Sequence, residues 1–579
     1  MKKIILLLLT LALLLGHAAV VSAEESDPYK YFCQFDEPQE LHVALSVGSD
    51  ATATLEGDDT LEDNFYTRWL LDNYNIKIVY DWTAGSADGD QRTAMTISSD
   101  TLPDAWIISP QYWKQCARNG QLRDITDLYN SEFCAPMLHE LYNSASGDVL
   151  DSCTYDGEFS SLTGMTIATE GVSVAMINKE WLDRLGLEEP ETLSDIYEIA
   201  KAFRDAKPAG DATIPILAPG AAEYLTSTFN ISSAVNIGLD AVFAANDAYP
   251  GFFYTDENGE VVYGTLTQET RNTLEMLAQW YKEGLLDPEI GIRTDCWAPI
   301  NANECGIFFG GWWNIGWGNP ASFSNDPNAN WKAYAVRNDN GEWYTKLPDI
   351  AAGSRFCISV DASEDAARAA MIAVSLLYDP VSQEFNTLTS EDIALYPLRL
   401  VVAPEDFVDR ARQHTIAVLE DEEPADLYKD SLLYTEIYTS TQYAKELIPT
   451  YTTLDELDAQ DFVISDENIN WQALYSWIFG DAPYATVERA KEVEPCISYM
   501  TESMELYWDN LYSAEKTMML TIITGEKDIS AFDAFVEQWY AEGGSTIREL
   551  RDHIPDIQAL GPSTVFLCYG LNDVSIGYW

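Results

Sequence analysis

Three tryptophans in the stretch 306–317, GIFFGGWWNIGW, are the side chains best suited to bind a ligand. The pattern predicts a strand that runs into glycines, which let backbones approach closely, and then a loop with Trp312, Trp313 and Trp317. Successive side chains of an extended segment point to opposite sides, so Trp312 and Trp313 cannot both enter one core. We therefore expect one ring to form a platform for the C–H face of a sugar; packing in a core is the alternative.

Three further stretches place informative residues at the ends of predicted strands. The segment SPQYW at 109–113 follows the apolar run 105–108, at the carboxyl end of a strand, where open α/β sheets bind ligands. Glu170 comes just before a second run, which we predict to be a strand that crosses the protein. The stretch 352–360, AGSRFCISV, resembles a strand that crosses back.

Motifs of common enzymes are absent from the sequence. It contains no G-x-S-x-G, no H-E-x-x-H and no P-loop, and its histidines lack the spacing of metal ligands. A glycosidase needs two carboxylates that face one bond, and the 94 acidic residues single out no pair. We expect a protein that is not an enzyme and that has no cofactor.

Calcium is the one metal for which the sequence offers weak candidates. Asp205 and Asp211 lie in the segment 205–215, DAKPAGDATIP. Two carboxylates are too few for the roughly six to eight oxygens that Ca²⁺ prefers, unless backbone and water complete the set. We expect no metal here.

The composition indicates a large acidic exported protein. The 579 residues suggest two to four domains or two large lobes, and a hydrophobic content of 47% is ample for their cores. The net charge of −61 is spread along the chain, which fits solubility and excludes nucleic acid as a partner. The nine cysteines leave disulfide pairing open, although Cys296 and Cys305 are close enough in sequence to bridge.

The N-terminal segment 1–23 predicts a secretory signal peptide. Lys2 and Lys3 precede the apolar run 4–16, and small residues end at Ala23, after which we expect cleavage. The run is too short for a membrane span, which takes roughly 20 residues. We therefore expect a secreted protein at the cell envelope.

Apolar periodicity predicts alternating strands and helices. Strands are expected at 41–47 and 76–80, and helices at 64–74, 193–206, 267–283 and 362–377. The tail 488–550 is expected to be largely helical, with breaks near Gly525 and Gly543. Such alternation predicts an α/β fold with mainly parallel sheets that are covered by helices.

Several short motifs occur in the order found in one known family. They are DTLPD at 100–104, GQLRDIT at 120–126, INKE at 177–180 and EGLLDP at 283–288. With the stretches above, this order resembles the family 1 extracellular solute-binding proteins (maltodextrin-binding-protein-like). The segments 522–529 and 532–535 resemble its large lipoprotein-type subgroup in gut Firmicutes.

The resemblance implies a two-lobed α/β fold, type II, whose lobes are joined by crossing hinge strands and close on a ligand. It implies a first lobe of 24–170 and 355–440 and a second lobe of 171–354, with a helical part, 441–579, that belongs mainly to the second lobe. It implies that a monomer captures a carbohydrate, an oligosaccharide above all, for the permease subunits of an ABC-type importer. The ligand-binding residues implied or expected are Gln111, Tyr112, Trp113, Glu170, Trp312, Trp313 and Trp317.

The sequence departs from the subgroup at its N-terminus. Residues 19–24 contain no cysteine for lipid attachment, and Cys33 lies too far downstream. Two alternative functions stay open: a secreted glycan-active hydrolase, which would release product, and a surface scaffold or adhesion protein with no small ligand.

Overall fold

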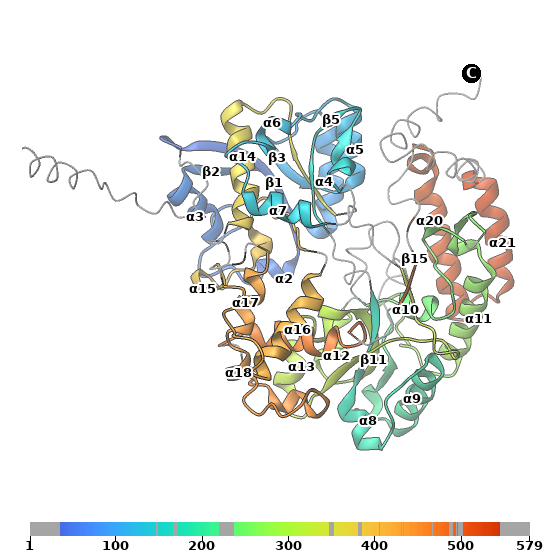
Figure 1. Ribbon diagram of the computed structural model, residues 1–579. Helices are drawn as coiled ribbons and strands as arrows, with labels where there is room; N and C mark the ends of the chain where they lie inside the picture. Colours follow the sequence, from blue (N-terminus) through green and yellow to red (C-terminus); the bar gives the residue numbers. More distant parts are fainter. Residues whose placement is uncertain are drawn as a thin grey trace, which may run out of the picture.

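The computed structural model describes residues 35–544, apart from 146–148, 166–171, 219–236, 257, 294, 347–352, 380–381, 383–384, 405, 430, 432, 466, 486–489, 494 and 496–501. The predicted signal peptide at 1–23 and the candidate residue Glu170 lie outside the described residues. The described chain forms two lobes, one above the other in Figure 1. We call the upper one the first lobe and the lower one the second lobe.

The first lobe is built on one sheet of strand order β2-β1-β3-β14-β6. Its strands are β1 (Gln39–Val47), β2 (Ile76–Gly85), β3 (Ala105–Ile108), β6 (Leu162–Thr163) and β14 (Arg355–Ile358). Strand β1 is parallel to β2 and β3, whereas β14 is antiparallel to β3 and β6. Around the sheet lie α2 (Ser49–Thr52), α3 (Phe65–Tyr74), α4 (Ser86–Ser98), α5 (Pro110–Arg118), α6 (Thr126–Tyr129), α7 (Pro136–Ser144), α14 (Glu364–Ser375), α15 (Phe385–Leu388) and the hairpin β4 (Thr154–Tyr155) with β5 (Glu158–Phe159).

The second lobe is built on a sheet of order β12-β7-β11-β8. Its strands are β7 (Ser173–Asn178), β8 (Ile214–Ile216), β11 (Cys305–Gly311) and β12 (Trp331–Tyr334). Its helices include α8 (Lys179–Leu185), α9 (Leu193–Ala206), α10 (Asp240–Ala244), α11 (Gln268–Lys282), α12 (Trp297–Asn301), α13 (Pro320–Asn325), α16 (Phe407–Leu419), α17 (Thr435–Thr441), α18 (Ala444–Leu447) and α19 (Asn470–Tyr475). Strand β7 is antiparallel to both neighbours, and β8 is parallel to β11.

The C-terminal part of the described chain packs on one flank of the second lobe, at the right of Figure 1. It comprises α20 (Glu502–Ile523), α21 (Ser530–Trp539) and the turn η14 (Tyr540–Gly544). These helices share a hydrophobic core with α11 and with the hairpin β9 (Phe253–Thr255) and β10 (Val261–Tyr263). A further pair, β13 (Tyr344–Lys346) and β15 (Lys491–Val493), runs parallel.

Side-chain capping explains why the predicted helices begin where they do. The Asn64 side chain accepts from the backbone of Tyr66 and Thr67 at the start of α3, and Thr192 and Asp195 form a capping box on α9. Ser363 caps α14 in the same manner. These boundaries agree with the sequence because a cap needs only neighbours along the chain.

The structure corrects one expectation about strands. The second sheet is mixed rather than mainly parallel, because β7 enters it from the crossing end and runs against β11 and β12. The region 488–550 is largely helical as expected, with α20 ending before Gly525 and a kink at Gly543, and it also contains the short strand β15. Strand β15 exists through pairing with β13, and no local pattern reveals such a distant partner.

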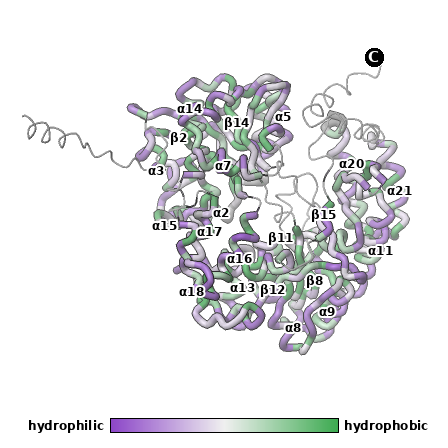
Figure 2. Tube along the Cα trace, viewed as in Figure 1, coloured by the Kyte–Doolittle hydropathy of each residue, from purple (hydrophilic) through white to green (hydrophobic). Residues whose placement is uncertain are grey.

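Buried hydrophobic residues form the cores of both lobes. Figure 2 shows hydrophobic and hydrophilic residues in turn along the trace of each lobe. Within the first lobe α14 is buried along most of its length, and its five alanines at 366–373 let it lie close to the sheet.

The cysteines Cys296 and Cys305 are free thiols, so the bridge that their spacing allows does not form. None of the helices in the described part of the chain is both long and apolar enough to cross a bilayer.

A buried carboxyl group joins the C-terminal helices to the rest of the second lobe. Glu515 on α20 is 1% exposed, and it accepts hydrogen bonds from the Tyr263 hydroxyl (2.5 Å) and the Thr265 hydroxyl (3.0 Å). Burial raises the pKa of Glu515 to about 7, against the lowering effect of the two hydroxyls and Lys516. The folded state therefore favours the protonated form.

We expect this group to destabilise the fold as the pH rises from about 4.5 to 7. Between these pH values the folded state still holds a proton that the unfolded state has lost. The contribution of Glu515 to the free energy of unfolding is therefore fully present below pH 4.5. Above pH 7 the free energy of unfolding is lower by roughly 3 kcal/mol. Urea unfolding at several pH values should show a shallower pH dependence for Glu515→Gln than for wild type. The exposed Glu537→Gln is the control, and equal slopes for all three proteins would contradict the expectation.

Candidate ligand-binding site

Both sheets present their candidate residues at the ends from which the chain crosses between lobes. In the first lobe Arg355 at the start of β14 pairs with Ile108 at the end of β3, directly before α5. In the second lobe Gly311 at the end of β11 pairs with Ser173 at the start of β7. The segments 166–171 and 347–352, which precede β7 and β14, run between the two sheets in the sequence. These two sheet ends define the candidate site.

The crossing segments meet in close backbone contact. Gly164 donates to the carbonyl of Ser354 (2.7 Å), and Met165 donates to the carbonyl of Val401 (2.9 Å). A Cβ on Gly353 would lie 2.2 Å from the carbonyl oxygen of Gly164. Segments from three distant parts of the sequence are thus held side by side, and glycine is required where they touch.

The three candidate residues at the start of helix α5 differ in how far they are buried. Pro110 begins the helix, after which Gln111 is exposed and Tyr112 is half-buried. The Tyr112 hydroxyl donates to the carbonyl of Asp90 on α4 (3.2 Å). Gln111 is therefore accessible to solvent, while Tyr112 also holds the two helices together.

Trp113 points into the first lobe and supports the site from beneath. It is 3% exposed, and its indole nitrogen donates to the Ser160 hydroxyl (3.0 Å). The guanidinium of Arg355 lies 5.1 Å from the ring centroid, and its Nη1 donates to Ser152 Oγ (3.3 Å). Since the ring already contacts Arg355, Trp113 fixes this buried cation at the sheet end.

Buried cysteines lie close to Arg355 at this end of the first sheet. Burial raises the pKa of the Cys116 thiol to about 12, and burial raises that of Cys357 well above its usual value. Arg355 Nη1 also lies 3.5 Å from the sulfur of Cys153. The sequence analysis did not single out Arg355, although it lies in the quoted stretch 352–360.

The three tryptophans after β11 differ in their exposure to solvent. Trp312 is 6% exposed and belongs to the core of the second lobe. Trp317 is 40% exposed, and its ring meets that of Trp312 edge to face, with centroids 5.6 Å apart. Trp313 is half-buried. The most accessible ring is therefore Trp317, and Trp312 holds it from behind.

A segment far along the chain positions this loop, and no sequence signal identified it. The turn η13 (Ser476–Gly480) packs on the turn η7 (Trp312–Ile315), and the Ser476 hydroxyl donates to the carbonyl of Trp313 (3.1 Å) across 163 residues of sequence. A Cβ on Gly480 would lie 2.0 Å from the carbonyl oxygen of Trp312. The carboxylate of Asp481 follows directly and is 1% exposed.

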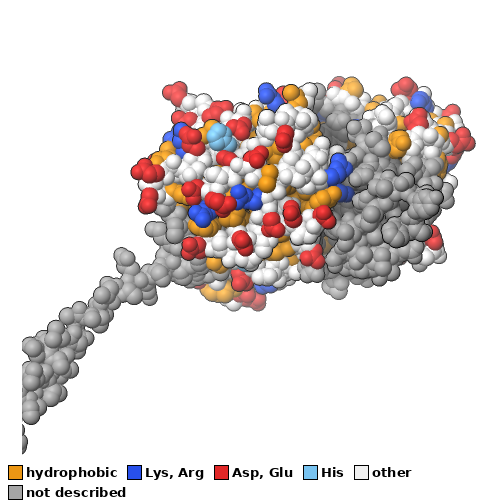
Figure 3. Space-filling model, turned by 90° about the horizontal axis from the view of Figure 1, so that it is seen from above, with side chains coloured by type: hydrophobic (Ala, Val, Ile, Leu, Met, Phe, Trp, Pro, Cys, Tyr) orange, Lys and Arg blue, Asp and Glu red, His pale blue; other side chains and the backbone are white. Residues whose placement is uncertain are grey.

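The metal candidates are engaged with lysine and arginine side chains. Asp205 pairs with Arg204 (2.7 Å), and Asp211, whose side chain is 97% exposed, pairs with Lys207 (2.8 Å). Among the described residues, no three His, Cys, Asp or Glu side chains are grouped to hold a metal ion. Acidic side chains are instead dispersed over the face seen in Figure 3, with Lys and Arg between them.

This arrangement of two helix-covered sheets, joined by crossings with candidate residues at the facing ends, defines the two-lobed class of periplasmic-binding-protein-like folds. Alginate-binding protein AlgQ2 shares the fold, with a TM-score of 0.57 at 16% identity over 90% of this chain and 99% of that one. A human-milk-oligosaccharide (HMO) binding solute-binding protein of Bifidobacterium longum infantis gives 0.56 at 15% identity over 90% and 99%. The two-lobed α/β expectation is thereby confirmed.

Residues 52–335 match the family of bacterial extracellular solute-binding proteins. The fructooligosaccharide ABC transporter substrate-binding protein FusA of Streptococcus pneumoniae is 25% identical over 36% of this chain and 39% of its own length. The polygalacturonan/rhamnogalacturonan-binding protein YtcQ of Bacillus subtilis is 24% identical over 41% and 44%. The sequence matches thus span less than half of these curated relatives.

The crossing contacts predict that Gly353→Ala destabilises the protein. The added methyl group meets the backbone of Gly164, which cannot move without shifting the crossing, so a loss of about 1–3 kcal/mol is expected. Thermal unfolding followed by circular dichroism measures the effect. Gly85→Ala is the matched control, because nothing lies within 4 Å of its Cβ position and its φ is −71°. Equal melting temperatures for the two variants would show that the crossing tolerates the methyl group.

Proposed function

We propose that the protein captures a carbohydrate between its two lobes, without altering it, and delivers it to an ABC-type importer. The observation that carries this proposal is the family match over 52–335, together with the two-lobed fold. The similar proteins support a carbohydrate as the ligand, since they include binders of fructooligosaccharide, alginate and HMO. An oligosaccharide is the ligand class we favour.

We propose that Trp317 and Trp313 provide the aromatic surface for sugar rings and that Gln111 and Tyr112 bind hydroxyl groups from the other lobe. Their exposure supports this assignment, since a ligand must reach the side chains that bind it. Trp312 and Trp113 act beneath them as supports. Glu170 remains a proposed hydroxyl-binding carboxylate on the crossing segment.

We propose new limits for the lobes, because the hydrophobic cores divide the chain differently from the expected boundary at 440. Val402 packs in the core of the first lobe, whereas Phe407 packs in that of the second. The first lobe then comprises 35–165 and 353–402, and the second comprises 172–346 and 407–544. The chain would cross three times, and hinge motion about these crossings would close the site.

A thermal-shift screen against mono- and oligosaccharides tests the function directly. A sugar at about 100 times its dissociation constant should stabilise the fold by about 2.7 kcal/mol, and the sugar should be recovered intact. Recovery of cleaved sugar would favour the alternative of a glycan-active hydrolase. The absence of any shift would favour a scaffold protein or another class of solute.

Trp317→Ala should weaken sugar binding by about 2 kcal/mol, or roughly thirtyfold, because the most exposed ring of the loop is lost. Isothermal titration with the sugar found in the screen measures the change. Trp69→Ala on α3 is the matched control, since this half-buried ring packs on Tyr74 and Phe385 in the first lobe. Unchanged affinity in Trp317→Ala would remove this residue from the site.

A further inference from the structure

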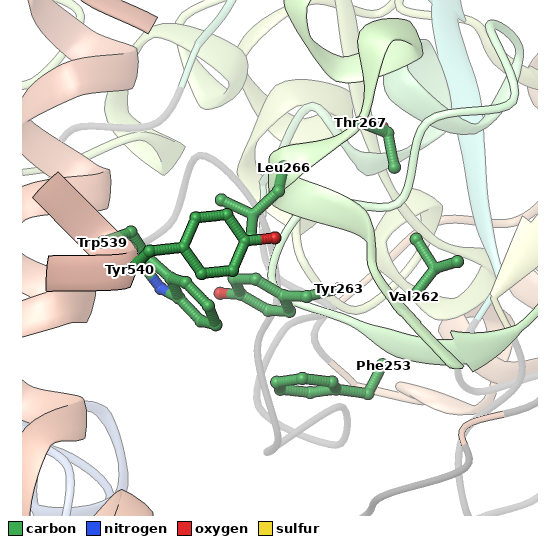
Figure 4. Close-up of a pocket in the computed structure, with 7 residues that line it drawn as sticks. All are labelled: Phe253, Val262, Tyr263, Leu266, Thr267, Trp539 and Tyr540. Atoms are coloured by element: carbon green, nitrogen blue, oxygen red, sulfur yellow. The ribbon is translucent and has the colours of Figure 1, made fainter. Parts of the chain in front are cut away.

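A small pocket lies outside the candidate site, at the seam between the hairpin β9–β10 and the C-terminal helices. Its volume is about 140 Å³. Figure 4 shows Trp539 and Tyr540 entering from one side and facing Tyr263 and Leu266 on the other. The other lining residues are Phe253, Val262 and Thr267. None of these belongs to the tryptophan loop after β11 or to α5, so the pocket is separate from the proposed sugar site.

The aromatic walls of this pocket are held in place. Tyr263 stacks on Phe253, with centroids 4.5 Å apart, and on Trp539, with centroids 5.4 Å apart. Trp539 in turn meets Tyr540 edge to face at 5.3 Å. The Tyr263 hydroxyl is fixed by its hydrogen bond to buried Glu515. Because the rings are anchored at both ends, they form a preorganised cavity.

The chemistry of the lining favours an uncharged ring. Among the residues that the structure describes, no Lys, Arg, His, Asp or Glu lines the pocket. The Thr267 hydroxyl already donates to the carbonyl of Gly264 (2.8 Å), so few polar groups remain for the many hydroxyls of a sugar. Thr267 and Tyr540 bring hydroxyl groups into the lining. A ligand with one polar group therefore fits this lining better than a bare hydrocarbon ring does.

The size of the pocket selects a single ring. A cavity of about 150 Å³ with apolar walls is known to hold one benzene molecule, which is close to the volume found here. We propose that this pocket is a second ligand site, for one uncharged six-membered aromatic ring with a hydroxyl group, that is, a compound of the phenol class. Such a ligand bridges α21 and the β9–β10 hairpin and binds independently of the sugar.

Fluorine NMR of 4-fluorophenol added to the full chain tests the proposal. Saturable binding of one molecule per chain is expected in the wild type. Leu266→Trp, which fills the pocket with an indole, should weaken it by about tenfold or more. Leu187→Trp is the matched control, because Leu187 is also a partly buried leucine on the core of the second lobe but lies outside the pocket. No binding by the wild type, or equal binding by folded Leu266→Trp, overturns the proposal.

A second variant covers the case in which Leu266→Trp does not fold. Leu266→Ala enlarges the pocket and should shift the preference from phenol towards 2-naphthol by about tenfold. An unchanged preference overturns the proposal. Glucose serves as the competing ligand: displacement of 4-fluorophenol by glucose in the wild type would identify a sugar subsite instead and would also overturn the phenol assignment. Sugar capture between the lobes is unaffected by any of these outcomes.

Discussion

The backbone contact between the crossing segments is the constraint on which the two-lobed structure depends. Gly164 donates to Ser354 and Met165 donates to Val401, and a side chain on Gly353 has no room. These hydrogen bonds join parts of the chain that are far apart in sequence, so each lobe is assembled from separate segments. Strands β6 and β14, which adjoin these contacts, are neighbours in the first sheet.

The crossings also explain the position of the candidate site. Strands β7 and β14 begin immediately after crossing segments, and each pairs with a strand that ends in candidate residues. The loop with Trp317 and the start of α5 therefore occupy the sheet ends next to the crossings. In each lobe a buried tryptophan, Trp312 or Trp113, supports the more exposed residues beside it. Each of these short segments thus contains both accessible and supporting side chains.

The C-terminal helices pack on the flank of the second lobe through a contact that differs in composition from the rest of its core. Their contact with the β9–β10 hairpin combines stacked aromatic rings with one buried carboxyl group, Glu515. Burial of a carboxyl group is costly unless hydroxyl groups or a proton compensate for it, and here both are available. At this seam the stacked rings hold the helices in place, the proposed pocket lies between the rings, and the buried Glu515 makes the stability of the fold depend on pH.

The sequence by itself determined the local features: the caps at Asn64, Thr192 and Ser363, the α/β alternation, and the order of motifs that indicated the family. Each depends on residues close together in the chain. The tertiary structure alone decided which tryptophan is exposed, the contacts of Arg355, the mixed second sheet and the strand β15. These depend on partners such as Ser476, 163 residues from Trp313, and a local pattern carries no information about so distant a contact.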